Sequence, residues 1–156
     1  MATRQTLTEM TDRFKRLKGT IEEGEWIAWK IVTDNMKSPT RDHGKLQYTV
    51  GATVTDPKRP NYDVREGCGA GLNVHATSPS TLNMRFWGRI ILLECRVKPE
   101  DVICIPLGAK PWKRDEHFTG GPKFRVKKLR VIASYLLQGR KLRAIKVARG
   151  YEVYGL

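Results

Sequence analysis

The side chains with the strongest chemical character in this sequence are cations gathered near its C-terminal end. Residues 109–156 contain thirteen Lys or Arg against only Asp115, Glu116 and Glu152, so they carry +10 of the chain's formal +13. A field this concentrated attracts polyanions, and the attraction weakens as salt is added. The sequence therefore predicts that nucleic acid, DNA or RNA, binds this region, with an acidic protein surface as the alternative partner.

The order of these cations along the chain predicts how they are displayed. Lys123, Arg125 and Lys127 alternate, so in a strand they project from one face. Lys128 and Arg130 fall on the other parity, which a β-bulge would repair. Nearby aromatic rings could stack on bases, as in single-strand binders: Trp112, Phe118 and Phe124. The candidate nucleic-acid-binding residues are Lys113, Arg114, Lys123, Arg125, Lys127, Lys128, Arg130, Arg140, Lys141, Arg143, Lys146 and Arg149. The alternative is a solvated basic face without a dedicated ligand.

An amphipathic helix is predicted over residues 6–22, followed by a stop at Gly24. Its apolar residues recur at spacings of three and four, which places them on one face: Leu7, Met10, Phe14, Leu17 and Ile21. Thr6 or Thr8 could cap its start, and Glu9 follows Thr6 at the spacing of a capping box. An isolated helix with such a stripe is not stable in water, so this face docks on its own domain or on a partner chain.

Strands dominate the rest of the sequence. Apolar or alternating runs predict strands at 26–32, 46–54, 72–76, 89–97, 102–106, 124–137 and 142–147. A short helix is expected to start at Ser78-Pro79, and a long exposed loop covers 108–122. These elements predict an α+β fold with a mainly antiparallel, twisted sheet of about seven strands. The expected organisation is a docking helix at 1–24 and a single α+β domain at 25–156.

Three blocks in the middle of the chain resemble a domain of tailed-phage rIIB-like proteins. The blocks are Gly71-Leu72-Asn73-Val74-His75-Ala76-Thr77, then 97–106 (VKPEDVICIP), then Lys128-Leu129-Arg130-Val131 with Tyr135. The family pattern reads roughly Cys-x-x-Gly-Leu-His-Val-Gly-Ser, and Cys68 occupies its cysteine position. The family's histidine position holds Asn73 here, with His75 two residues later. The resemblance covers about residues 26–137 and implies a phage or prophage origin, and with it a place in a larger phage or host assembly.

The segment from Gly71 to Val97 also resembles part of an ADP-ribosyltransferase fold. That resemblance implies a dinucleotide pocket, for which the candidate residues are Lys30, Gly71, Asn73, His75 and Thr77. Such enzymes favour His or Arg at the position of Lys30 and need a carboxylate that stabilises an oxocarbenium-like centre. The acidic residues here have no characteristic spacing, so we expect no catalytic residues, no cofactor and a non-enzymatic binding protein. A degenerate enzyme is the alternative.

The cysteines and the hydropathy limit the remaining classes. Cys68, Cys95 and Cys104 are odd in number and lack zinc-like spacing, so neither a disulfide framework nor a metal site is expected. No apolar run is long enough for a membrane span, and the first residues lack the apolar core of a secretory signal. The expected location is the reducing cytoplasm of the host cell, with association with the virion as an alternative.

Overall fold

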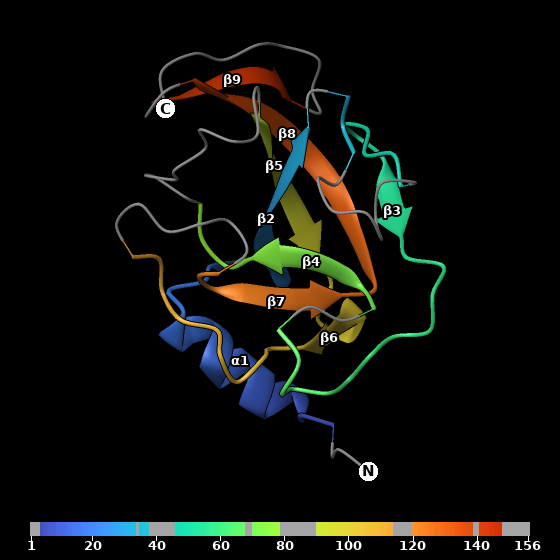
Figure 1. Cartoon of the computed structure of the whole chain (residues 1–156), viewed down its shortest axis with the longest axis vertical. Coiled ribbons are helices and arrows are strands. Elements are labelled where there is room, and N and C mark those ends of the chain that lie inside the picture. The colour runs from blue at the N-terminus through green and yellow to red at the C-terminus, as the bar shows by residue number, and fades with distance from the viewer. Residues whose placement is uncertain are drawn as a thin grey trace.

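The described residues fold into one strongly bent antiparallel sheet with one α-helix at its end (Figure 1). The computed structural model describes residues 4–33, 35–37, 46–67, 70–78, 90–113, 120–138 and 141–147, with only the backbone at 90, 136–138 and 141–147. The helices in these residues are α1 (Leu7–Arg16) and the 3-10 helix η2 (Pro99–Asp101). The strands are β1 (Ile21–Glu22), β2 (Glu25–Thr33), β3 (Thr53–Thr55), β4 (Leu72–His75), β5 (Ile90–Val97), β6 (Val102–Cys104), β7 (Lys123–Val126), β8 (Lys128–Gln138) and β9 (Lys141–Val147). The α+β class and the antiparallel sheet are as predicted.

The sheet bends because the chain turns a corner between β7 and β8. Its order is β3-β8-β5-β2-β4-β7-β6, with β1 added to β2 and β9 added to β8, and every pairing is antiparallel. The strand predicted over 124–137 is therefore two strands with different neighbours. The break falls at Lys127, whose N–H donates to the carbonyl of Asp101 rather than to a strand ladder. Figure 1 shows β4 and β7 lying across β2, β5 and β8 as a result.

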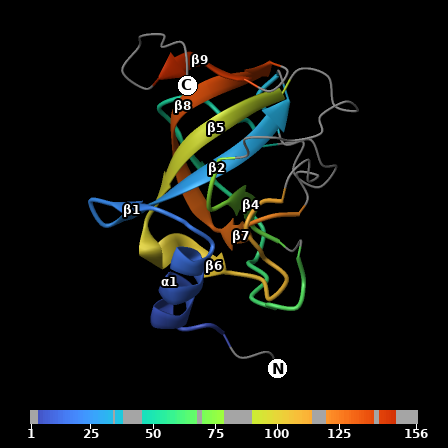
Figure 2. The same cartoon turned by 90° about the vertical axis from the view of Figure 1, so that its left-hand side faces the viewer.

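Helix α1 packs against this bend rather than standing apart from the sheet. The Phe14 ring stacks on Trp26 at 4.2 Å between centroids and meets Phe124 edge-on at 5.4 Å. Of the five residues in the predicted apolar face, Met10, Phe14 and Leu17 are buried, and Ile21 is partly buried against the same core. Leu7 remains 50% exposed. The chain's own core thus accounts for four of the five residues expected to dock, and Figure 2 shows α1 at the lower end of the long strands.

The helix is shorter than predicted, although its start is correct. Thr6 caps it by accepting a hydrogen bond from the Glu9 N–H at 3.1 Å. The helix ends at Arg16 because Lys18 adopts a positive φ of 68°, which breaks the helical path. The chain then reverses, and Ile21 begins strand β1.

The remaining differences lie in the connections between strands. The strand predicted over 46–54 is reduced to β3, preceded by a single bridge between Lys37 and Gln47. The short helix predicted from Ser78 onward lies outside the described residues. No helix in the described part of the chain is long and apolar enough to cross a membrane.

Candidate nucleic-acid interface

Strands β4 and β7 carry a second, polar layer on the side that faces away from the core. Their inward residues are apolar and fully or almost fully buried: Leu72, Val74, Phe124 and Val126. Their outward residues are opposite one another in the ladder, Asn73 with Arg125 and His75 with Lys123. Strand parity therefore puts cations on one outer face, as the sequence predicted. Phe124 belongs to the core, so the prediction that it stacks on bases is wrong.

Arg125 lies on this outer face but is completely buried, with 0% of its surface exposed. A loop at residues 61–66 covers it, and its guanidinium donates to three carbonyls of that loop. Nε donates to Asn61 O at 3.2 Å, Nη2 to Asp63 O at 2.6 Å, and Nη1 to Glu66 O. The planar fork of arginine suits this task because its donors point in several fixed directions at once. Arg125 holds the loop and has no surface to offer to a phosphate.

The two neighbouring cations are also used inside the structure. Lys127 Nζ donates to the carbonyls of Asp56 and Lys58, so it anchors the turn that follows β3. Lys123 is only 8% exposed. The prediction that Lys123, Arg125 and Lys127 form an exposed basic face is therefore wrong. Lys123 and Arg125 do lie on the same face of β7, but a loop distant in the sequence covers Arg125.

The other candidate cations divide into three groups. Lys113 and Lys128 are exposed, whereas Arg130 pairs with Glu25 at 3.3 Å. Arg114, Arg140 and Arg149 lie outside the described residues. The third group is on β9, where only the backbone is described: Lys141, Arg143 and Lys146.

A bulge aligns the three cation positions of β9. Residues 141, 143 and 146 pair with Gln138, Leu136 and Ser134 of β8, which alternate along that strand and so share a face. An odd separation of three residues would normally put 143 and 146 on opposite faces. The register shifts between Ser134 and Tyr135 and leaves residue 145 as the extra residue, which restores the parity. The edge strand thus presents three cation positions on one side.

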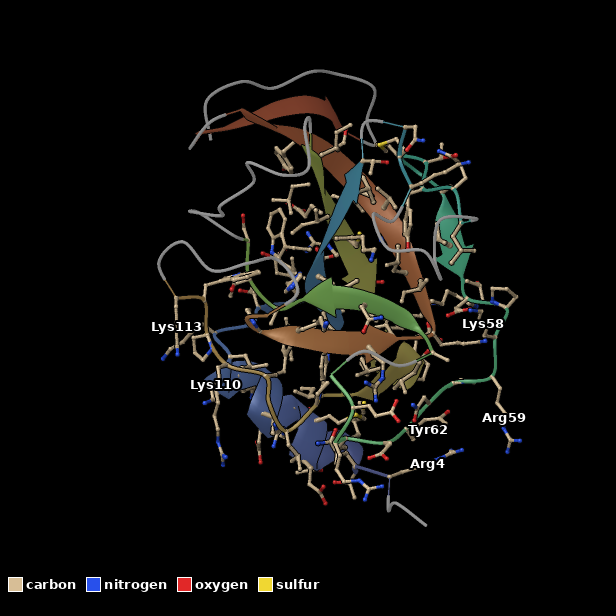
Figure 3. All side chains as sticks on the ribbon, in the orientation of Figure 1. Arg4, Lys58, Arg59, Tyr62, Lys110 and Lys113 are labelled. Atoms are coloured by element: carbon tan, nitrogen blue, oxygen red, sulfur yellow. The ribbon has the colours of Figure 1, made fainter. Side chains whose placement is uncertain are left out.

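A second group of exposed cations lies in and around the turn that follows β3: Arg4, Lys58, Arg59 and Lys128. Together with the partly buried Tyr62 they form what we call the basic corner. Lys58 and Arg59 are exposed between Pro57 and Pro60, and Lys128 is opposite Thr55 at the end of β3. The Arg4 guanidinium lies over the Tyr62 ring, 3.7 Å from its centroid. In Figure 3 the four labelled members lie along one side of the lower half of the molecule and point away from the ribbon.

The turn at residues 56–60 was not among the sites predicted from the sequence. The signal was present, since two adjacent cations lie between two prolines with only Asp56 beside them. In the structure Asp56 is 1% exposed, and its Oδ1 accepts from the Lys58 N–H at 2.9 Å, which fixes the turn. Asp63, in the same loop, is paired with Arg65 at 2.8 Å. The hydrogen bonds from Arg65 lower the pKa of Asp63 to about 2, so this pair persists at neutral pH.

The residues predicted to form a dinucleotide pocket do come together, but they bond to the protein itself. Lys30 is 6% exposed, and its Nζ donates to the Asn73 carbonyl at 2.9 Å. The His75 ring packs 4.6 Å from Trp112, whose Nε1 donates to the Thr77 carbonyl at 3.0 Å.

Gly71 completes this group through close packing. It has a φ of +134°, and a Cβ there would lie 2.8 Å from the Ile103 side chain. These contacts join β2, β4, β6 and the 109–113 segment into one unit. The five residues predicted to line a dinucleotide pocket therefore support the structure.

Other groups suited to catalysis are equally enclosed. Burial raises the pKa of both described thiols, Cys95 and Cys104, so neither is a ready nucleophile at neutral pH. Burial also raises the pKa of Tyr135 to about 12, with a further contribution from Glu94. Within the described residues no three His, Cys, Asp or Glu side chains lie close enough to hold a metal ion.

Titration with NAD is expected to give no measurable heat, even at millimolar NAD. Lys30 and His75 are almost completely buried and already bonded, so a dinucleotide would have to break these contacts to reach them. Isothermal titration calorimetry checks this directly. Heat of binding that disappears in Asn73→Ala or His75→Ala, with both variants still folded, would show that a dinucleotide site is present after all.

Comparison with family models, curated proteins and solved structures finds no match for this chain. The resemblances to rIIB-like proteins and to ADP-ribosyltransferases therefore remain predictions. On the described surface the basic corner is the prominent feature, and the backbone of β9 adds three cation positions on one side.

Proposed function

We propose that this chain is a non-enzymatic binding protein that holds nucleic acid, preferably single-stranded, on the basic corner and β9. The main support is the exposure of Lys58, Arg59 and Lys128, none of which pairs with a carboxylate of the described residues. Unpaired cations grouped on one surface release counterions from a phosphate backbone when they bind it. The aligned positions 141, 143 and 146 offer a second set of cation positions on β9, at the other end of the sheet (Figure 1).

The Arg4–Tyr62 pair supports single-stranded nucleic acid as the ligand. A guanidinium lying over a tyrosine ring is a ready platform on which an unpaired base can stack. Bases inside a duplex are stacked on each other and cannot reach such a platform. Lys58 and Arg59 lie in the same loop as Tyr62 and can contact the phosphates on either side of a stacked base.

The binding experiment below also tests two alternatives, an acidic protein ligand and an accessory role in a phage assembly. An acidic protein would also bind the basic corner, but it has no bases to stack on Tyr62. The resemblance to rIIB-like proteins supports a phage origin and action in the host cytoplasm, and an accessory role in a phage assembly would be compatible with either ligand.

Reversing the charges of the basic corner is expected to weaken binding to a single-stranded oligonucleotide and to flatten its salt dependence. For single strands the slope of log K against log salt is about −0.7 per phosphate contact. The triple variant Lys58→Glu, Arg59→Glu and Lys128→Glu should therefore reduce the slope by about 2. Tyr62→Ala should lower affinity about tenfold with the slope unchanged, because it removes stacking and no charge. Fluorescence anisotropy at several salt concentrations measures both quantities.

A charge-matched control separates a local site from net charge. Lys15, Lys18 and Lys110 are also exposed, and Figure 3 shows Lys110 on the side opposite Lys58. Changing these three to glutamate alters the net charge equally, and we expect the slope to stay near that of the unmodified protein. Equal losses in both triple variants would contradict a specific basic corner. Binding of an acidic peptide, with no binding of oligonucleotides at low salt, would favour a protein ligand.

A further inference from the structure

An open groove of about 410 Å³ runs along α1, between the helix and the loops that carry Val64 and Leu107. Its lining is polar on the helix side and apolar on the other: Gln5, Glu9, Asp12, Arg13, Arg16, Val64 and Leu107. Leu107 is 57% exposed, which is unusual for a leucine in this structure. The loops that carry Val64 and Leu107 are joined by a hydrogen bond from Leu107 N–H to Val64 O at 2.8 Å. The apolar wall is therefore held in place.

The four charged residues on the helix wall form a single stripe with a particular order. The stripe consists of Glu9, Asp12, Arg13 and Arg16. Their spacings of three, one and three residues put them on one side of the helix. The two acids come first and the two arginines come second. The stripe is therefore its own complement when a second copy runs antiparallel, because Glu9 then faces Arg16 and Asp12 faces Arg13.

These charges are not neutralised within the helix. Glu9–Arg13 and Asp12–Arg16 have the four-residue spacing that allows ion pairs. Neither pair is formed, and no other carboxylate or cation of the described residues pairs with them. Arg13 instead donates through Nη2 to the Pro106 carbonyl at 2.8 Å, which ties it to the segment after β6. Gln5 holds the same segment by bonding both the N–H and the carbonyl of Ile105.

We propose that the partner for this groove is a second copy of the chain, docked with the two α1 helices antiparallel about a two-fold axis between residues 12 and 13. Each acid of one stripe then faces an arginine of the other, giving four intermolecular pairs related by symmetry. The exposed Leu107 is covered by the aliphatic stems of the second copy's arginines, which lie along apolar surface while their charged ends remain solvated. This inference is independent of nucleic-acid binding.

The association is weak and depends on salt. Exposed ion pairs contribute little individually, and the apolar part of the contact consists of two side chains on each copy. We expect a dissociation constant on the order of 0.1 mM at low salt. Adding about 0.5 M salt shortens the screening length to a few ångströms and should leave only monomer.

Analytical ultracentrifugation of charge-swap variants tests the arrangement. Glu9→Arg places arginine opposite arginine, and Arg16→Glu places glutamate opposite glutamate, so each variant alone should be monomeric. A mixture of the two should form a heterodimer, since one copy then carries only cations at these positions and the other only anions. The double variant E9R/R16E restores opposite charges within one sequence and should dimerise like the unmodified protein.

Samples must be free of nucleic acid, because a bound strand could bridge two copies. The ultraviolet absorbance of nucleic-acid bases relative to that of the aromatic side chains shows whether any remains. Lys15→Glu changes the same helix outside the stripe and should leave the dimer intact. Circular dichroism establishes that each variant is folded. An unmodified protein that stays monomeric near 1 mM at low salt, or single variants that do not recombine on mixing, would overturn the proposal.

Discussion

Replacing Arg125 with methionine is expected to lower the free energy of unfolding by about 3–5 kcal/mol. Methionine fills a similar volume but leaves the carbonyls of Asn61, Asp63 and Glu66 without donors beneath their loop. Each buried carbonyl that loses its partner costs about 1–3 kcal/mol, reduced where the loop can open to water. Chemical denaturation followed by tryptophan fluorescence measures the difference.

Two further variants distinguish the guanidinium geometry from its charge. Arg125→Lys retains the charge, but one ammonium nitrogen cannot replace three nitrogens that donate in different directions, so its loss should be intermediate. Lys128→Met removes an exposed cation nearby and should change stability by no more than about 0.5 kcal/mol. A stability of Arg125→Met equal to that of Lys128→Met would contradict the anchoring role.

The same substitution should also weaken nucleic-acid binding, although Arg125 cannot touch the ligand. The loop held by Arg125 continues directly from the turn that carries Lys58 and Arg59, so its release disorders the basic corner. Arg125→Met should therefore lower oligonucleotide affinity under conditions in which the protein is still folded. A loss of both stability and oligonucleotide affinity would show that Arg125 acts by positioning the cations of the basic corner.

Truncating Phe14 to alanine is the second substitution with a large expected effect, about 3–5 kcal/mol. Phe14 has no exposed surface and lies between Trp26 and Phe124, so its removal leaves a cavity at the point where α1 meets the bent sheet. Leu7→Ala on the same helix should cost no more than about 0.5 kcal/mol, because that side chain is half exposed. Thermal and chemical unfolding check both values.

Gly19 provides a sharper test of the same contact. A Cβ at Gly19 would lie 2.4 Å from Phe14 Cζ, so Gly19→Ala should destabilise the protein by about 1–3 kcal/mol. With Phe14 already truncated the clash is gone, and adding the methyl group should cost almost nothing. The double-mutant cycle should therefore give a coupling of about 1–3 kcal/mol. Additive effects would mean that the helix does not close over Gly19 in this way.

Local patterns were sufficient to predict much of the sheet. The apolar runs of β2 and β5 placed these strands within one or two residues, because such runs are specified by neighbours close in sequence. The cap at Thr6 was equally local, and Thr6 was one of the two residues predicted for that role. The long strand over 124–137 was predicted as continuous because its break at Lys127 depends on a hydrogen bond to Asp101, twenty-six residues earlier.

The candidate site was harder to predict, for the same reason. Parity correctly grouped Lys123 and Arg125 on one face of their strand, but parity carries no information about what covers that face. The covering loop at 61–66 lies about sixty residues earlier in the chain, and its three carbonyls turn a predicted ligand-binding arginine into an internal anchor. The exposed Lys58 and Arg59, which were not among the predicted sites, are the better candidates.

The sequence by itself determined the α+β class, the positions of the main strands, the apolar face of α1 and the excess of positive charge. Each of these follows from composition or from a period of two to four residues, which neighbouring positions specify. Only the tertiary structure decided which cations reach solvent, because burial depends on segments far apart in the chain. It also decided that Lys30, Asn73 and His75 support the protein rather than form an open pocket, since their donors and acceptors meet partners from other elements.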